Sequence, residues 1–452
     1  DVFPGEVYAA VHETFKEEVE WVCEKIELQA KTHPLQDIAI LLRQKKHGPD
    51  FVEALESRGI PVQVADPEIL VELPEVRDVL CYLELMVDPT ANTSLIRLLA
   101  GAKWRVGARD LAILGNHARL LVNDDYESEK HLPMNEQLQV HVAKVDRADR
   151  VCLLDALELV EHSNMPYSDE ARRRMISCAS ELRELRKYAG DTAIDAIVRI
   201  ILFSGLGVEA WSRPNLGKSH DDRLGALIDL AGAYRSLDGD SSIHSFIRFL
   251  SDGKRFDALP GLETAFSDDA VVLMTVHKSK GLEFPVVAVP NLAETKFPAT
   301  LPGLQHWVKR ASFLPIALQE REINDERVKV FAFGSAFRST DYKGYTAAFN
   351  DLRLLDERRL AYVAVTRAKK VLIASACWWF PEVSEPRGPS IFLQEILNHV
   401  THVEPEASTP EDGATNPLFS NPDRLLWPHR INEEHFNQLI AQVDLVRSAQ
   451  NE

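Results

Sequence analysis

Hydrophobic positions follow two different periods in the first 64 residues. In residues 14–30 the apolar side chains recur every three or four positions, as in an amphipathic helix. Residues 37–42, DIAILL, form an almost unbroken apolar run instead, and residues 6–11 and 60–64 are further strand-like runs. A helical pattern at 50–58 joins two of these runs through short turns. Strand, helix and strand in this order predict a parallel sheet with helices packed against it.

The middle of the chain has a helical period. The predicted helices are residues 93–99, 108–121, 151–160, 168–188, 192–204, 221–237 and 242–250. Strand-like runs return at 271–289. We therefore predict an α/β fold, in which a parallel-sheet domain is interrupted by a mostly helical inserted domain. The expected domains are residues 1–88 and 266–400 for the two parts of the sheet domain, 89–265 for the insert and 401–452 for a C-terminal extension or linker.

Two blocks combine apolar runs with a concentration of polar groups. Residues 271–289, VVLMTVHKSKGLEFPVVAV, place a polar loop between two strand-like runs. Residues 356–368, DERRLAYVAVTRA, have a helical pattern that ends in Thr-Arg shortly before the apolar run 371–376. Polar side chains at the ends of buried strands are where open α/β sheets bind ligands. These two blocks are therefore the candidate functional segments.

Composition places the chain among folded globular proteins with more than one domain. It has 452 residues, of which 45% are apolar and 27% charged. The five cysteines form no C-x-x-C pair, which argues against a zinc site and a disulfide framework and favours reduced thiols in the cytoplasm. No run approaches the ~18 apolar residues of a membrane span, and no signal peptide is recognisable. The first residue is not Met, so we expect a fragment.

The net charge of −18 argues against a nucleic-acid partner, because phosphates are bound by lysine and arginine. The distribution of charge changes this picture, since residues 266–380 contain more basic than acidic residues and the other segments are acidic. This segment holds both candidate blocks. The pattern is compatible with a local polyanion site on an acidic body, and also with chance.

Gly217-Lys218-Ser219 has the last three residues of a phosphate-binding loop. The pattern G-x-x-x-x-G-K-[ST] also requires a glycine where the chain has Ser212, and the segment follows a helical pattern instead of a strand. In addition, no convincing apolar strand ends in the paired acids that hold magnesium. We therefore expect this chain to lack both of these nucleotide-binding elements.

Residues 275–287 (TVHKSKGLEFPVV) and 357–370 (ERRLAYVAVTRAKK) resemble motifs V and VI of UvrD/Rep-like superfamily 1 DNA helicases. Residues 37–43 (DIAILLR) resemble motif IV, and 290–298 match the segment that follows motif V. The order of these blocks resembles the RecA-like 2A domain of the family, which the helical 2B domain interrupts. The resemblance implies the C-terminal half of an ATP-dependent motor, whose N-terminal half supplies the phosphate loop and the Mg²⁺ ligands.

A narrower resemblance involves residues 103–115, KWRVGARDLAILG, and 425–430, LLWPHR. They are similar to segments of actinobacterial AdnAB-type helicase-nuclease subunits. This resemblance implies that a second subunit is a partner, and that a nuclease domain follows Glu452. The chain departs from UvrD relatives at 44–50, QKKHGPD, and in the length of the segment 301–350.

The resemblance assigns two arginines to the ATP phosphates. Hydrolysis spreads negative charge over the γ-phosphoryl oxygens, and an arginine from a second domain stabilises this charge when the domains close. Arg367 is the candidate for this arginine finger, and the alternative is a cation that complements the C-terminal end of its helix. Arg43, at the end of a buried strand, is the second implied γ-phosphate ligand. The alternative for Arg43 is an exposed arginine beside Lys45 and Lys46.

The motif V block implies further contacts. Gly281 permits a tight backbone approach, and the Glu283 carboxylate is implied to accept hydrogen bonds from the ribose hydroxyls. Lys280 is a candidate γ-phosphate contact, with a solvated loop lysine as the alternative. Thr275 and His277 are implied contacts to a DNA phosphate, and a structural histidine is the alternative for His277.

The implied function is that of an ATP-dependent DNA helicase or translocase that acts in DNA repair or recombination in the cytoplasm. The implied partners are single-stranded DNA, a duplex junction, the missing N-terminal motor domain and a second helicase-nuclease subunit. This half lacks the phosphate loop and is expected to be inactive alone. The alternative is a non-catalytic DNA-binding or protein-interaction module that has kept the helicase fold.

Overall fold

The computed structural model describes residues 5–129, 152–212, 216–234, 239–256, 259, 269–299, 339–402, 404, 407–411, 413–420, 437 and 440–441. The chain divides into two compact units, Asp1–Ile69 with Ala265–Pro422 and Leu70–Thr264 with Asp423–Glu452. The first unit is therefore interrupted in sequence by the second. None of the helices in the described part of the chain is long and apolar enough to cross a membrane.

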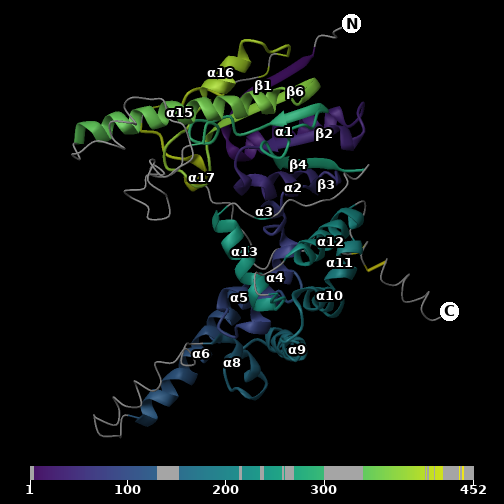
Figure 1. The fold of residues 1–452 in the computed structure, drawn as a ribbon. Coiled ribbons are helices and arrows are strands. Elements are labelled where there is room, and N and C mark those ends of the chain that lie inside the picture. Colours follow the sequence, from purple (N-terminus) through teal and green to yellow (C-terminus); the bar gives the residue numbers. More distant parts are fainter. Residues whose placement is uncertain are drawn as a thin grey trace, which may run out of the picture. The chain divides into compact units, whose positions relative to one another are not determined.

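One six-stranded sheet forms the centre of the first unit. Its strands are β1 (Glu6–Thr14), β2 (Ile38–Leu42), β3 (Val62–Val64), β4 (Val271–Thr275), β5 (Phe284–Val289) and β6 (Ala368–Trp379). They lie in the order β1-β6-β5-β2-β4-β3, and every neighbouring pair is parallel (Figure 1). All residues of β2 and β4 are buried, as expected of parallel strands covered on both faces. The predicted α/β fold is confirmed.

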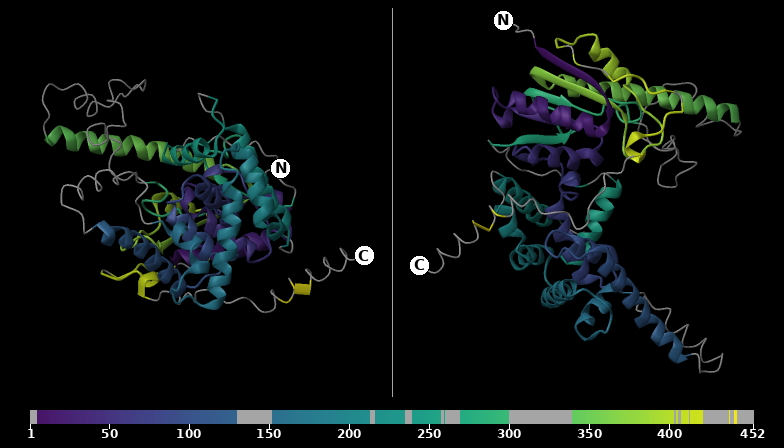
Figure 2. Two further views of the ribbon diagram at one scale, coloured as in Figure 1. Left: turned by 90° about the horizontal axis from the view of Figure 1, so that it is seen from below. Right: turned by 180° about the vertical axis from the view of Figure 1, so that it is seen from behind.

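Helix α1 (Phe15–Gln29) begins at a capping box directly after β1. The Thr14 hydroxyl accepts from the Glu17 N–H, and the Glu17 carboxylate accepts from the Thr14 N–H. The helix then packs against β6 and β1 (Figure 2). The remaining elements of this part are α2 (Gly48–Glu56), α15 (Ser339–Val365), α16 (Ile391–Leu397), α17 (Pro417–Ser420) and the 3₁₀ turns η1 (Leu35–Asp37) and η2 (Lys45–His47). Helix α3 (Pro67–Leu70) leads into the second unit.

Part of the expected C-terminal extension lies along the outer edge of β1. The Thr401 N–H donates to the main-chain oxygen of Val7 at 3.0 Å, and the Ala407 N–H donates to that of Val11 at 2.8 Å. These bonds occupy acceptors that an edge strand otherwise exposes. Residues 421–436, which include the LLWPHR segment, lie outside the described residues.

The described part of the second unit is helical. Its elements are α4 (Pro74–Val87), α5 (Asn92–Ala100), α6 (Ala108–Glu129), α8 (Leu153–Glu158), η4 (Val160–His162), α9 (Asp169–Arg186), α10 (Ala193–Ser204), α11 (Leu206–Ser212), α12 (Gly217–Ala233) and α13 (Ile243–Phe256). Helix α4 lies at the centre and contacts α5, α9, α10, α12 and α13. Its buried residues cover more than one face, so the helix needs neighbours on several sides.

Three elements differ from the sequence-based expectations. Helix α4 lies in the second compact unit, although residues 1–88 were expected to belong to the sheet domain. Helix α15 begins at Ser339, well before the helical pattern recognised at 356–368. Helix α11 was not expected, and the Gly217-Lys218-Ser219 segment forms the first turn of α12.

Candidate functional site

Arg367 lies in the short connection between α15 and β6, where its guanidinium group binds neutral oxygen atoms. Nη1 donates to the main-chain oxygen of Leu282 at 2.8 Å, and Nε donates to that of Val363 at 3.0 Å. Nη2 donates to the Thr366 hydroxyl at 3.1 Å. The Val363 contact is the helix-end interaction that the sequence left open as the alternative role. Among the described residues no carboxylate pairs with Arg367, so its positive charge is available to an anion.

The loop of the motif V block reaches this arginine with its last residues. Glu283 is exposed and lies 3.3 Å from the Lys369 ammonium group, and both side chains are 54% exposed. A surface ion pair of this kind contributes about 0–1 kcal/mol, so a ligand can replace it at little cost. Lys280 and Gly281 are exposed as well. The structure therefore brings Arg367, Glu283 and the loop residues before it together.

Gly281 has a φ of +88°, and nothing lies within 4 Å of the position that a Cβ atom would take. Position 281 therefore needs glycine because of its backbone conformation and not for lack of space, since other L-amino acids rarely adopt this φ. The sequence led us to expect that another group approaches the backbone closely at Gly281, and no group of the described residues does so.

Arg43 directly follows β2 and forms a two-pronged ion pair with Glu357 of α15. Its Nε donates to Oε2 at 2.9 Å and its Nη2 to Oε1 at 2.6 Å. The Glu357 carboxylate also accepts from the Ala299 N–H at 3.0 Å. Arg43 is thus not the exposed arginine of the alternative prediction, because its side chain is 21% exposed and its charge is compensated.

The structure does not bring the two expected phosphate ligands together. Arg43 lies beyond the C-terminal end of β2, whereas Arg367 lies before the N-terminal end of β6, and both strands run in the same direction. Glu357, the partner of Arg43, comes before Arg367 in the chain, at a separation that corresponds to about 15 Å along a helix axis. The two guanidinium groups share no partner among the described residues.

Thr275 and His277, the expected DNA contacts, differ in exposure. Thr275 ends β4 and is 2% exposed, and its hydroxyl donates to the carboxylate of Asp66 at 3.1 Å. Asp66 is fully buried and also accepts from the Glu68 N–H at 3.1 Å. His277 is exposed. In this structure His277 is therefore accessible to DNA, whereas the Thr275 hydroxyl is used inside the protein.

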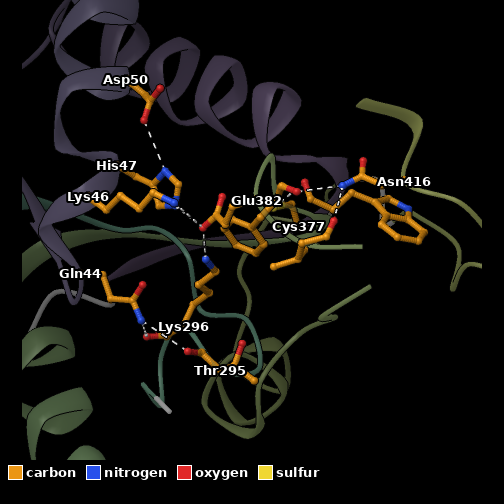
Figure 3. A network of polar contacts seen from close by, with 12 residues as sticks. Gln44, Lys46, His47, Asp50, Thr295, Lys296, Cys377, Glu382 and Asn416 are labelled. Atoms are coloured by element: carbon orange, nitrogen blue, oxygen red, sulfur yellow. Dashed lines mark hydrogen bonds and ion pairs between the residues drawn. The ribbon is translucent and has the colours of Figure 1, made fainter. Parts of the chain in front are cut away.

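A cluster of charged groups joins the segments that follow β2, β5 and β6 (Figure 3). The Glu382 carboxylate lies 3.2 Å from Nε2 of His47 and 3.3 Å from the Lys46 ammonium group, and it also binds Lys296. Nδ1 of His47 lies 3.4 Å from Asp50. Burial alone would raise the pKa of Glu382, but the hydrogen bond from Lys296 and the charge of His47 lower it to about 2.

Asn416 fixes the backbone beside this cluster (Figure 3). Its side-chain amide donates to the main-chain oxygens of Phe380 at 2.9 Å and Val383 at 2.7 Å. Asn416 is 1% exposed, so these bonds satisfy carbonyl groups away from water. The sequence offered no local signal for this contact, nor for the pairs of Arg43 with Glu357 and Thr275 with Asp66, because the partners are far apart along the chain.

The described residues contain no group of three or more His, Cys, Asp or Glu side chains that could hold a metal ion. The five cysteines are free and buried. Arg367 and Glu283 suit a phosphate and a sugar hydroxyl, respectively, because one is a cation without a carboxylate partner and the other is an exposed carboxylate. The described site thus fits parts of a nucleotide better than a metal ion.

Comparison with known proteins identifies the family. The chain matches the model of the UvrD-like helicase C-terminal domain over residues 5–378, and it therefore belongs to this family. The resemblance to the C-terminal half of UvrD/Rep-like helicases is confirmed. The more particular similarity to AdnAB-type proteins stays a prediction.

Similar proteins include several ATP-dependent helicases. An ATP-dependent helicase/nuclease subunit of Lactobacillus acidophilus is 26% identical over 340 residues, 75% of this chain and 24% of that protein. The ATP-dependent DNA helicase PcrA of Staphylococcus aureus is 23% identical over 388 residues, 85% of this chain and 43% of that protein. The probable DNA helicase II homolog of Rickettsia felis is 23% identical over 391 residues, 85% and 47% of the two chains. The chain thus spans less than half the length of each of these relatives.

Proposed function

We propose that the chain is the C-terminal motor half of an ATP-dependent DNA helicase or translocase, with Arg367 as its arginine finger. The observation that carries the proposal is the set of acceptors around Arg367. Two main-chain oxygens and one hydroxyl orient the guanidinium group without neutralising its charge. An oriented cation of this kind stabilises the negative charge that develops during phosphoryl transfer.

The neighbouring loop supplies the other nucleotide contacts of the proposal. Glu283 would exchange its weak pair with Lys369 for the ribose hydroxyls, and Lys280 would extend from the same exposed loop toward the γ-phosphate. Arg43 is kept as a second phosphate ligand only because residues 37–43 resemble motif IV, since in this structure it lies at the other end of the strands from Arg367. In the proposal, the phosphate loop and the Mg²⁺ ligands come from the N-terminal motor half.

The DNA contacts of the proposal begin at His277, which is exposed just beyond the C-terminal end of β4. The buried hydrogen bond from the Thr275 hydroxyl to Asp66 holds this segment in place. In the proposal, Thr275 contacts a DNA phosphate only after its hydroxyl has given up this bond. The sheet unit corresponds in this proposal to domain 2A and the helical unit to domain 2B, which faces the duplex junction. A further protein partner is proposed as well, because one relative is named as a subunit of a helicase/nuclease.

The test is ATP hydrolysis by the complete protein and by the 452-residue chain alone, each with and without single-stranded DNA. The proposal expects hydrolysis that DNA stimulates in the complete protein and none in the chain alone. DNA binding without any hydrolysis by the complete protein would instead establish a non-catalytic module with a helicase fold. Hydrolysis by the chain alone would contradict the division of the ATP site between two halves.

A further inference from the structure

Glu283 and Lys369 lie at the same end of two neighbouring strands as Arg367. The Phe284 N–H donates to the main-chain oxygen of Arg367 at 2.9 Å, and Phe284 pairs with Ala368 in the register of β5 and β6. Glu283 directly precedes one member of this pair, and Lys369 directly follows the other. Both side chains therefore leave a main chain that the sheet holds in place, so Glu283 can exchange partners by side-chain rotation alone.

The ion pair between the two side chains uses one oxygen of the carboxylate. The Lys369 ammonium group lies 3.3 Å from Oε2 of Glu283, and both side chains are more than half exposed. An exposed pair of this kind is weak, because water competes for both of its charges. Oε1 is open to a hydrogen-bond donor, whereas Oε2 already has the ammonium group beside it.

A ribose can use both oxygens of this carboxylate. It offers two neighbouring donors, the 2′- and 3′-hydroxyls, and an ionised carboxylate has two acceptor oxygens. A ribonucleotide that donates to each oxygen competes with Lys369 for Oε2 of Glu283. A 2′-deoxyribonucleotide has only the 3′-hydroxyl, which can use Oε1 and leave the ion pair in place. The pair thus opposes the contact that distinguishes the two kinds of nucleotide.

We infer that Lys369 is a specificity-determining residue: by competing for Oε2 of Glu283, it weakens the preference of the site for ATP over dATP. The inference rests on the proposed function, because it takes Glu283 as the ribose contact. Lys369 acts through Glu283 and does not itself touch the ribose. A site whose carboxylate had no such partner would select more strongly for the 2′-hydroxyl.

The test is the ratio of the KM for dATP to the KM for ATP, measured for hydrolysis by the complete protein with saturating single-stranded DNA. Lys369→Met removes the ammonium group but keeps a long side chain. We expect it to raise the ratio about threefold, mainly through a lower KM for ATP, with kcat within about twofold of wild type. Lys369→Arg keeps the charge and the ion pair, and should leave the ratio within about 1.5-fold.

Lys370→Met is the matched control. Lys370 is exposed and is the next residue of β6, so its side chain leaves the opposite face of the strand from Lys369. The substitution removes the same charge and weakens the general attraction of a nucleotide. Since ATP and dATP carry equal charges, this attraction cancels in the ratio, which should stay within about 1.5-fold of wild type.

Glu283→Ala shows whether the effect passes through the carboxylate. Alone it should lower the ratio, and in its background Lys369→Met should change the ratio by less than about 1.5-fold. A ratio that Glu283→Ala leaves unchanged would remove the ribose contact and the inference with it.

Two further results distinguish the inference from the proposed function. A ratio that Lys369→Met leaves unchanged, or that Lys370→Met raises equally, would overturn the inference and leave the proposed function intact. A complete wild-type protein without DNA-stimulated hydrolysis would contradict the proposed function itself.

Discussion

Arg367 binds both neighbours of Glu283. Its Nη1 donates to the main-chain oxygen of Leu282 at 2.8 Å, and its own main-chain oxygen accepts from the Phe284 N–H at 2.9 Å. One residue thus ties the end of α15 to the loop between β4 and β5 on each side of the glutamate. The proposed arginine finger and the proposed ribose contact therefore have linked positions, so a shift of one is transmitted to the other.

The conformation of this loop depends on Gly281. Because its φ is +88°, Gly281→Ala should lower the free energy of unfolding by about 1–2 kcal/mol, even though a Cβ atom would meet no neighbour. Chemical denaturation of the chain measures this change. Gly115→Ala is the matched control, since Gly115 lies in α6, its Cβ position is also open and no positive φ is found there. It should raise the stability by about 0.5–1 kcal/mol. Equal effects of the two substitutions would contradict the conformational argument.

The buried bond between Thr275 and Asp66 should be visible in stability. Thr275→Val keeps the shape of the side chain but removes the hydroxyl donor at 3.1 Å from Asp66. With a fully buried carboxylate left short of one donor, we expect a loss of about 1–3 kcal/mol in the free energy of unfolding. Thr275→Ser retains the hydroxyl and should cost about 1 kcal/mol at most, for one lost methyl group. If the valine variant were as stable as the serine variant, the hydroxyl would not support this loop.

Glu382 should make the stability depend on pH in the acidic range. Its pKa is lowered from 4.5 to about 2 in the folded protein, because the hydrogen bond from Lys296 and the charge of His47 outweigh the effect of burial. The ionised carboxylate therefore stabilises the fold above pH 4.5, and this contribution disappears as the pH falls toward 2. Glu382→Gln should lower the stability at pH 7 by about 1 kcal/mol, since solvent screens this partly exposed cluster.

The difference between wild type and Glu382→Gln should shrink steadily when unfolding is measured from pH 5 down to about 2. Glu385→Gln, a substitution of an exposed residue three positions further on, serves as the control and should change stability by less than about 0.5 kcal/mol. If the stability difference between wild type and Glu382→Gln stayed constant over this range, Lys296 and His47 would not be lowering the pKa of the Glu382 carboxylate.

Local patterns predicted most of the sheet because its strands carry strong signals. The buried apolar runs of β2 and β4 leave few alternatives to a covered parallel strand, and the start of α1 is marked by Thr14 and Glu17. Helix α4 was expected in the sheet domain, because it follows β3 and the short helix α3 in sequence, whereas its apolar residues pack against helices of the second compact unit. The start of α15 was missed, since residues 339–355 include Gly344 and mix polar and apolar positions without a clear period.

The candidate site was predictable as a set of residues but not as a set of contacts. Motif blocks pointed to Arg43, Arg367 and the loop that contains Glu283, and the structure brings Arg367 and this loop together. The partner of Arg43 is Glu357, 314 positions away, and that of Thr275 is Asp66, 209 positions away. Pairs at such separations follow from the strand order β5-β2-β4-β3 and the packing of α15, which no local period reveals.

The arginine finger is the central claim, and the most direct test is the kcat for ATP hydrolysis by the complete protein carrying Arg367→Ala. Arg359→Ala is the control, because the Arg359 side chain is 79% exposed on α15, the helix that precedes Arg367, and pairs only with nearby Asp356 among the described residues. We predict that Arg367→Ala lowers kcat about 1,000-fold with a KM for ATP within about threefold of wild type, whereas Arg359→Ala stays within about twofold. Undiminished hydrolysis by the Arg367→Ala variant would contradict the account.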